Sequence, residues 1–180
     1  MILYINSCVR VDSRTDRLAR AVLEIMGEYS ELYLPDENIK PLSRELLEKR
    51  TSLLVAGNTT DEMFRYAQQF ANAEKIVISA PFWDGSFPSI LKVYLENIYA
   101  VGIVSRYDEN GNPIGMCRAN ELVYVTTAGG KFIPDFSYNY IKAIAENCFG
   151  IKKTWLIMAE MLDIDGFDGE KILQNTINSL

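Results

Sequence analysis

The sequence predicts an α/β fold, in which a parallel sheet carries helices on both of its faces. Three observations lead to this prediction: short apolar runs recur along the 180 residues, the segments between them have helical periodicity, and the two kinds of segment alternate. Strands that alternate with helices pair in parallel through right-handed crossovers, which place helices on both sides of the sheet. The length and the hydrophobic share of 48% lead us to expect a single domain, residues 1–180.

Each expected strand is a short apolar run of the kind found in parallel strands that are buried on both faces. The runs are Ile2–Ile5, Ser30–Leu34, Lys75–Ala80, Leu122–Thr126 and Thr154–Met158. The second run is the weakest and is stopped by Pro35. Because a helix directly follows the first strand, the five strands fit the flavodoxin-like order 2-1-3-4-5 in a three-layer sandwich.

Helices are expected between these strands. The first helix has Ser13 or Thr15 as its N-cap, and its apolar residues fall on one face: Leu18, Val22, Ile25 and Met26. Another begins at Pro88, a residue that suits the first turn of a helix. The remaining helices are expected over Pro41–Leu54, Thr60–Asn72, Phe136–Asn147 and Gly169–Ser179.

The composition excludes several kinds of site and partner. The absence of histidine excludes Ser-His-Asp and Cys-His catalysis and the usual imidazole metal sites, so no metal is expected. A formal net charge of −6 without a basic patch argues against nucleic acid as a partner. No apolar run approaches the ~18 residues of a membrane span, and MILYINS lacks the pattern of a signal peptide. The widely spaced Cys8, Cys117 and Cys148 indicate reduced thiols, so we expect a cytoplasmic protein without a membrane partner.

Three loops are predicted to form one binding site, because ligands of such sheets collect at the carboxyl ends of the strands. The loops are NSCVRVDSRT (6–15), SAPFWDGSFP (79–88) and VTTAGGKF (125–132). In the first loop, the hydroxyls of Ser7, Ser13 and Thr15 could surround a phosphate together with the free N–H groups of the helix start. The alternative is that Ser13 and Thr15 only cap the helix.

The second and third loops are typical of a site for a flat ring. Phe82 and Trp83 could form one wall of a planar slot, or they could simply fill the core. Gly129 and Gly130 lack side chains, so the backbone there can approach a ring closely. A phosphate cradle combined with an aromatic wall and a glycine wall suits flavin mononucleotide (FMN).

The chain resembles the FMN-dependent azoreductases and NAD(P)H:quinone oxidoreductases of the flavodoxin-like superfamily. The resemblance runs from Ile2 to about Glu160, through SAPFWDGSFPSILKVYLENIYAVGIVSRYDENGNPIGM, ELVYVTTAGG and ENCFGIKKTWLIMAE. It implies a homodimer with FMN at the subunit interface, NADH or NADPH as electron donor, and a small-molecule acceptor such as a quinone or azo compound. It also implies that no side chain is obligatory for catalysis, because the flavin carries the chemistry.

The resemblance assigns positions of this sequence to the cofactor and to the substrate. The residues implied for cofactor binding are Ser7, Ser13, Arg14, Thr15, Pro81, Phe82, Trp83, Asp84, Gly85, Thr127, Ala128, Gly129 and Gly130. Those implied for the substrate pocket are Trp83, Tyr107 and Cys148, with Tyr107 reaching the flavin of the partner subunit. The chain departs from the family pattern at Asp84, where asparagine is frequent, and at Ala128, where arginine is frequent.

Two other functions remain open at this point. Cys8, five intervening residues and then Arg14-Thr15 match the spacing of the phosphate loop in low-molecular-weight tyrosine phosphatases, with Cys8 as the nucleophile and Arg14 as the phosphate clamp. The loop interior has no glycine and carries Asp12, which opposes a bound phosphate. The other alternative is a non-catalytic flavodoxin-like electron carrier, which usually has a strongly acidic docking face.

Overall fold

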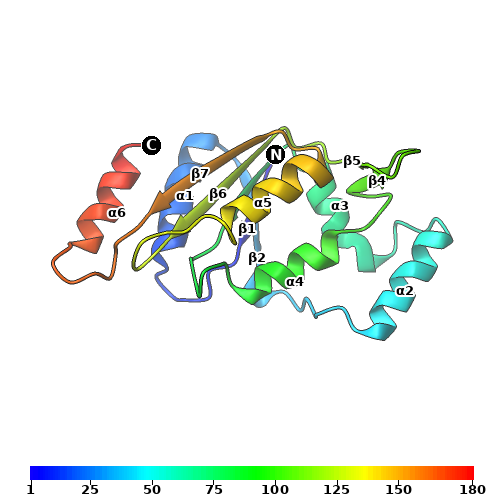
Figure 1. Ribbon diagram of the computed structural model, residues 1–180, viewed down its shortest axis with the longest axis horizontal. Helices are drawn as coiled ribbons and strands as arrows, with labels where there is room; N and C mark the ends of the chain where they lie inside the picture. Colours follow the sequence, from blue (N-terminus) through cyan, green and yellow to red (C-terminus); the bar gives the residue numbers. More distant parts are fainter.

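A computed structural model describes all 180 residues and has a five-stranded parallel sheet at its centre (Figure 1). The strand order is β2-β1-β3-β6-β7. The strands are β1 (Ile2–Asn6), β2 (Tyr29–Tyr33), β3 (Lys75–Ser79), β6 (Glu121–Thr127) and β7 (Lys153–Ala159). Each of these strands overlaps one of the expected apolar runs, so the parallel α/β sheet is confirmed. None of the helices combines the length and apolar character needed to cross a bilayer.

The expected order 2-1-3-4-5 becomes β2-β1-β3-β6-β7 because two further short strands occur along the chain between the third and fourth strands of the main sheet. These two strands form a separate antiparallel hairpin. It consists of β4 (Ser105–Tyr107) and β5 (Pro113–Gly115). The turn is held by Asp108, whose Oδ1 accepts hydrogen bonds from the N–H groups of Asn110 and Asn112. Three-residue strands with largely polar surroundings carry no apolar run, so the sequence pattern did not predict them.

The helices cover both faces of the sheet, as expected. They are α1 (Arg14–Met26), α2 (Arg44–Val55), α3 (Arg65–Asn72), α4 (Ser89–Ile98), α5 (Tyr138–Ile144) and α6 (Gly169–Asn178). Short helical turns lie at η1 (Leu34–Asp36), η2 (Glu62–Phe64) and η3 (Ala145–Phe149), the last being a π-turn. The core on one face includes residues of α1 and α6, and the core on the other includes residues of α3, α4 and α5. Helix α2 buries no side chain completely and lies at the edge of the molecule (Figure 1).

The helix boundaries differ from the predicted ones in ways that have local causes. Ser13 is the N-cap of α1, where its Oγ accepts a hydrogen bond from the Asp16 N–H. Pro88 is the N-cap of α4 and lies just before the helix, not within its first turn. The expected helix 136–147 is divided into α5 and the π-turn η3, which ends at Gly150 in the left-handed conformation (φ +80°).

Alkaline pH is expected to destabilise this fold. Burial raises the pKa of Cys117 to about 12, and it raises the pKa values of Tyr4, Tyr94 and Tyr124 above their ordinary value of 10.0. The unfolded chain ionises at the lower, ordinary pKa values, so the contribution of these groups is complete below about pH 8 and is lost as the pH rises. We expect the free energy of unfolding in urea to fall by about 2–3 kcal/mol between pH 8 and pH 10.

The same titration in Cys117→Ala provides the control for this prediction. Thiols have the lowest ordinary pKa of the buried groups, and burial also raises the pKa of the Cys8 thiol, so removal of Cys117 should reduce the pH-dependent loss by roughly a third. An identical loss in the variant would show that Cys117 makes no such contribution.

Candidate functional site

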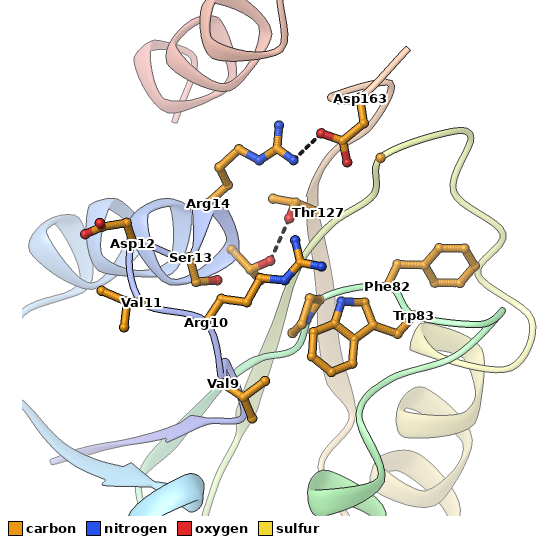
Figure 2. A pocket seen from close by; sticks show the side chains of 13 residues that line it. Val9, Arg10, Val11, Asp12, Ser13, Arg14, Phe82, Trp83, Thr127 and Asp163 are labelled. Carbon is orange, nitrogen blue, oxygen red and sulfur yellow. Dashed lines mark hydrogen bonds and ion pairs between the residues drawn. The ribbon is translucent and has the colours of Figure 1, made fainter.

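A cavity of about 350 Å³ lies at the carboxyl ends of the strands, a volume in the range of small-molecule sites. Its lining comes from the three loops expected from the sequence and from a fourth loop, after β7 (Figure 2). The lining residues are Val9, Arg10, Val11, Asp12, Ser13, Arg14, Thr15, Pro81, Phe82, Trp83, Thr127, Gly129 and Asp163. The convergence of loops far apart in the sequence makes this cavity the candidate site.

The first loop presents a continuous row of free hydrogen-bond donors. None of the backbone N–H groups from Val9 to Thr15 donates a hydrogen bond within the chain. Asp12 lies in the left-handed region at φ +56°, which bends the loop between β1 and α1. Successive N–H groups in such a bend, at the positive end of a helix, are the usual protein site for an anion. The loop can therefore bind a phosphate without a metal ion.

A partly buried polar network beneath the loop fixes its shape. The Asp16 carboxylate accepts hydrogen bonds from the Tyr4 hydroxyl at 2.6 Å, Asn6 Nδ2 at 2.9 Å and Arg20 Nε at 2.8 Å. The Oδ1 atom of Asn6 in turn accepts the N–H of Cys8 at 3.0 Å. Asp16 thus anchors the end of β1 to the start of α1 and holds the first residues of the loop.

Cys8 belongs to this structural layer and is not poised for attack on a substrate. It is 2% exposed, does not line the cavity, and its Sγ lies 3.5 Å from Ser79 Oγ. Burial raises the pKa of the Cys8 thiol, which disfavours the thiolate that a phosphatase nucleophile requires.

The Arg14 side chain is engaged outside the loop. Its Nη2 lies 2.5 Å from Asp163 Oδ1, and its Nη1 donates to the Leu162 carbonyl at 2.9 Å. A Cβ atom on Gly129 would overlap the Asp163 carboxylate, so a side chain at this position would displace that carboxylate. Arg14 therefore ties the start of α1 to the loop after β7, and its guanidinium is not free to clamp a phosphate as the phosphatase hypothesis requires.

The second loop contains a tight two-residue turn next to Trp83. The N–H of Trp83 donates to the Ser86 carbonyl at 3.0 Å, and the Ser86 N–H donates back at 2.8 Å. Asp84 (φ +49°) and Gly85 (φ +82°) occupy the corner, where both positions need a positive φ. Both residues were predicted to bind the cofactor, but neither lines the cavity. The positive φ values of the turn account for the residue types at these two positions.

The third loop contributes mainly backbone. Thr127 Oγ1 lies 2.6 Å from Thr15 Oγ1, which joins the loop to the start of α1. Ala128 is buried, while the N–H groups of Gly129 and Gly130 donate no hydrogen bond within the chain. Of these residues, Thr127 and Gly129 line the cavity.

Three other predicted residues lie away from the cavity. Ser7 is fully buried, and its hydroxyl and N–H both donate to the Ser79 carbonyl. Tyr107 is 53% exposed on the β4–β5 hairpin. Cys148 belongs to the π-turn η3, which precedes β7 and so lies at the opposite end of that strand from Asp163. Within one chain, the predicted substrate residues Trp83, Tyr107 and Cys148 are not brought together.

The sequence analysis missed the lining residues Val9, Arg10, Val11, Asp12 and Asp163. The first four lie inside the expected loop, but only its hydroxyl residues, Cys8 and Arg14 were given binding or catalytic roles. Asp163 was missed because it lies in an acidic segment, DIDGFDGE, that is typical of a solvated turn. Its position directly after the fifth strand was the available signal, since that strand also ends at the binding edge.

Comparison with known proteins identifies close relatives of this chain. A family model described as "Flavodoxin-like fold" matches residues 1–180. The "FMN-dependent NADH:quinone oxidoreductase 2" of Clostridium acetobutylicum is 33% identical, over 98% of this chain and 94% of the relative. The "FMN-dependent NADH:quinone oxidoreductase" of Coprothermobacter proteolyticus is 35% identical, over 94% of this chain and 90% of the relative.

Solved structures show the same fold at lower sequence identity. An azoreductase from Bacillus anthracis superimposes with a TM-score of 0.85 at 17% identity, over 99% of this chain and 95% of that one. An FMN-dependent NADH-azoreductase from the same species, solved in complex with FMN, gives a TM-score of 0.82 at 21% identity, over 99% of this chain and 94% of that one.

Proposed function

This chain belongs to the flavodoxin-like family that includes the FMN-dependent NADH:quinone oxidoreductases, and we propose that it is itself such an enzyme, reducing quinones or azo compounds. The observation that carries the proposal is the row of free N–H groups from Val9 to Thr15 at the mouth of the cavity. A cofactor with a terminal phosphate matches these donors, and a flat ring matches the remaining walls of the cavity.

The residues present fit FMN. The N–H groups of the first loop and the Ser13 hydroxyl would hold the phosphate, where the positive end of α1 adds a favourable charge. Pro81, Phe82 and Trp83 would bound the ring on one side. The free N–H groups of Gly129 and Gly130 are available to polar atoms of the ring edge. Bound FMN supplies the two-electron redox chemistry that connects NADH with the acceptor.

The protein's own contribution is to bind, orient and shield. The aromatic side chains of Phe82 and Trp83 exclude water from one side of the cavity, and Phe82 is held by an edge-on contact with Phe132 at a centroid distance of 5.0 Å. The Thr15–Thr127 contact and the Arg14–Asp163 ion pair keep three of the loops at a fixed spacing. We assign no side chain an obligatory catalytic role, and the absence of histidine is compatible with this mechanism.

We also propose that the active form is a cytoplasmic homodimer. The support for a dimer is that Tyr107 protrudes on its hairpin, away from the cavity of its own chain, while the family resemblance assigns it to the substrate pocket. In a dimer the hairpin of one copy would complete the cavity of the other. The three free cysteines support a reducing compartment.

The test of the proposed function begins with FMN and the purified protein. The protein should be yellow, or become so with added FMN, and should oxidise NADH when a quinone is supplied. Flavin binding without turnover of NADH would favour the electron carrier. A colourless protein that hydrolyses an aryl phosphate, with the activity lost in Cys8→Ala, would establish the phosphatase.

Trp83→Ala is expected to lower kcat/KM for the quinone by about 10-fold or more while the fold stays intact, because it removes one wall of the cavity. Trp155→Ala is the matched control: Trp155 is the other tryptophan of the chain, lies on β7 and is 55% exposed. Steady-state kinetics on both variants measure kcat/KM, and circular dichroism checks that the fold is intact. Unchanged kinetics in Trp83→Ala would remove Trp83 from the site.

A further inference from the structure

Two arginines line the cavity, and only one of them is committed to a partner. Arg14 is paired with Asp163 and also donates to the Leu162 carbonyl. Arg10 makes no ion pair with any acidic side chain and no hydrogen bond within the chain. Its only specific contact is with Trp83, whose ring centroid lies 5.8 Å from the Arg10 Cζ atom.

Arg10 is the uncompensated positive charge of the cavity. Four charged residues line it: Arg10, Asp12, Arg14 and Asp163. The charges of Arg14 and Asp163 cancel within their ion pair. Figure 2 shows the Asp12 carboxylate directed away from the cavity interior, whereas the Arg10 side chain extends into it, over Trp83. An anion that enters the cavity therefore meets Arg10 as the available cation.

The contact with Trp83 holds Arg10 only weakly. A cation–π contact at an exposed site is worth less than a charge-assisted, bidentate bond between a guanidinium and a phosphate. Arg10 also lies in the same loop as the free N–H groups from Val9 to Thr15, so its backbone and its side chain serve the same part of the cavity. The side chain can therefore leave the indole for an anion at little cost.

We propose that Arg10 determines the preference of the cavity for a phosphorylated flavin over an unphosphorylated one. Its guanidinium rests on Trp83 in the free protein and binds the phosphate of FMN in the complex. This inference rests on the proposed function, because it assumes that FMN is the ligand. It adds a residue that neither the sequence pattern nor the loop hydroxyls identified.

The experiment measures the dissociation constants of FMN and riboflavin for the wild type and Arg10→Gln, from the change in flavin fluorescence. Riboflavin has the same ring but no phosphate. We expect Arg10→Gln to weaken FMN binding about 10-fold or more and riboflavin binding less than about 3-fold. The dependence of FMN binding on salt concentration should also become weaker, because one cation is lost from the contact.

Two further variants serve as controls. Arg44→Gln changes the net charge equally, but Arg44 is exposed on α2 and does not line the cavity, so this variant should leave both constants unchanged. Arg10→Lys keeps the charge without the bidentate fork, so it should restore part of the preference for FMN. If Arg10→Gln fails to fold, the dissociation constants of FMN and riboflavin for Arg10→Lys test the inference instead. A preference for FMN equal to that of the wild type would then contradict it.

The outcomes separate this inference from the proposed function. A wild type that binds FMN, together with an Arg10→Gln variant that keeps the wild-type preference for FMN over riboflavin, would overturn the role of Arg10 alone. Equal weakening of both flavins would also overturn it, because Arg10 would then act on the ring and not on the phosphate. A wild type that binds neither flavin would overturn the proposed function and this inference with it.

Discussion

Replacing Asp16 by alanine is expected to lower the free energy of unfolding by about 2 kcal/mol. The carboxylate accepts hydrogen bonds from Tyr4, Asn6 and Arg20, and the Tyr4 side chain is fully buried. Its removal takes away the acceptor that these donors share at the point where β1, β2 and α1 meet, and leaves Tyr4 with Ser79 and both Asn6 and Arg20 with Glu31. Because Asn6 also positions the N–H of Cys8, FMN binding should weaken together with stability.

Urea denaturation followed by circular dichroism measures the first effect, and flavin titration measures the second. Asp16→Asn keeps the size of the side chain and one accepting oxygen, so it should cost less than the alanine variant. Glu24→Ala is the matched control, because Glu24 is an exposed acidic residue on the same helix without an ion pair. A loss below about 1 kcal/mol in Asp16→Ala would show that the network does not depend on its carboxylate.

Gly115→Ala is expected to destabilise the protein by about 3 kcal/mol or more, because the new methyl group has no space. A Cβ atom at this position would overlap the backbone of Phe149 and Gly150, which cannot yield as a flexible side chain would. The β4–β5 hairpin would then separate from η3. Since that hairpin carries Tyr107, the homodimer proposed above should also be weakened.

Gly111→Ala in the same hairpin separates crowding from backbone strain. Gly111 lies at φ +79° and a Cβ atom there would meet nothing within 4 Å. Its substitution should cost only about 1 kcal/mol, the usual penalty of the left-handed conformation. Thermal unfolding of the two variants, side by side, gives the comparison, and equal losses would contradict the close packing of Gly115 on η3.

Much of the fold could be predicted because its central strands β1, β3 and β6 are buried on both faces. The run Lys75–Ala80 is apolar apart from Lys75 and Ser79, and it matches the bounds of β3 to within one residue. The β4–β5 hairpin has no such signal, since its register depends on the Asp108 turn and on contact with η3. Contacts with residues outside the hairpin, and not the local sequence pattern, determine where these three-residue strands form.

The site was predictable at the level of loops but not of side-chain contacts. Topology alone brings the three loops to one edge, and Ser13 was identified from its capping position. The role of Ser7 could not be inferred, because its partner is the carbonyl of Ser79, distant in the sequence. The pairing of Arg14 with Asp163 is likewise a long-range contact that no local motif encodes.

That pairing has a consequence for the way in which the protein acquires its cofactor. The cavity is walled by residues from Val9 near the start of the chain to Asp163 near its end, so a nascent polypeptide that lacks β7 and its following loop has no closed site. We therefore expect the complete site to form only when synthesis has passed β7 and Asp163, and cofactor capture to follow that point.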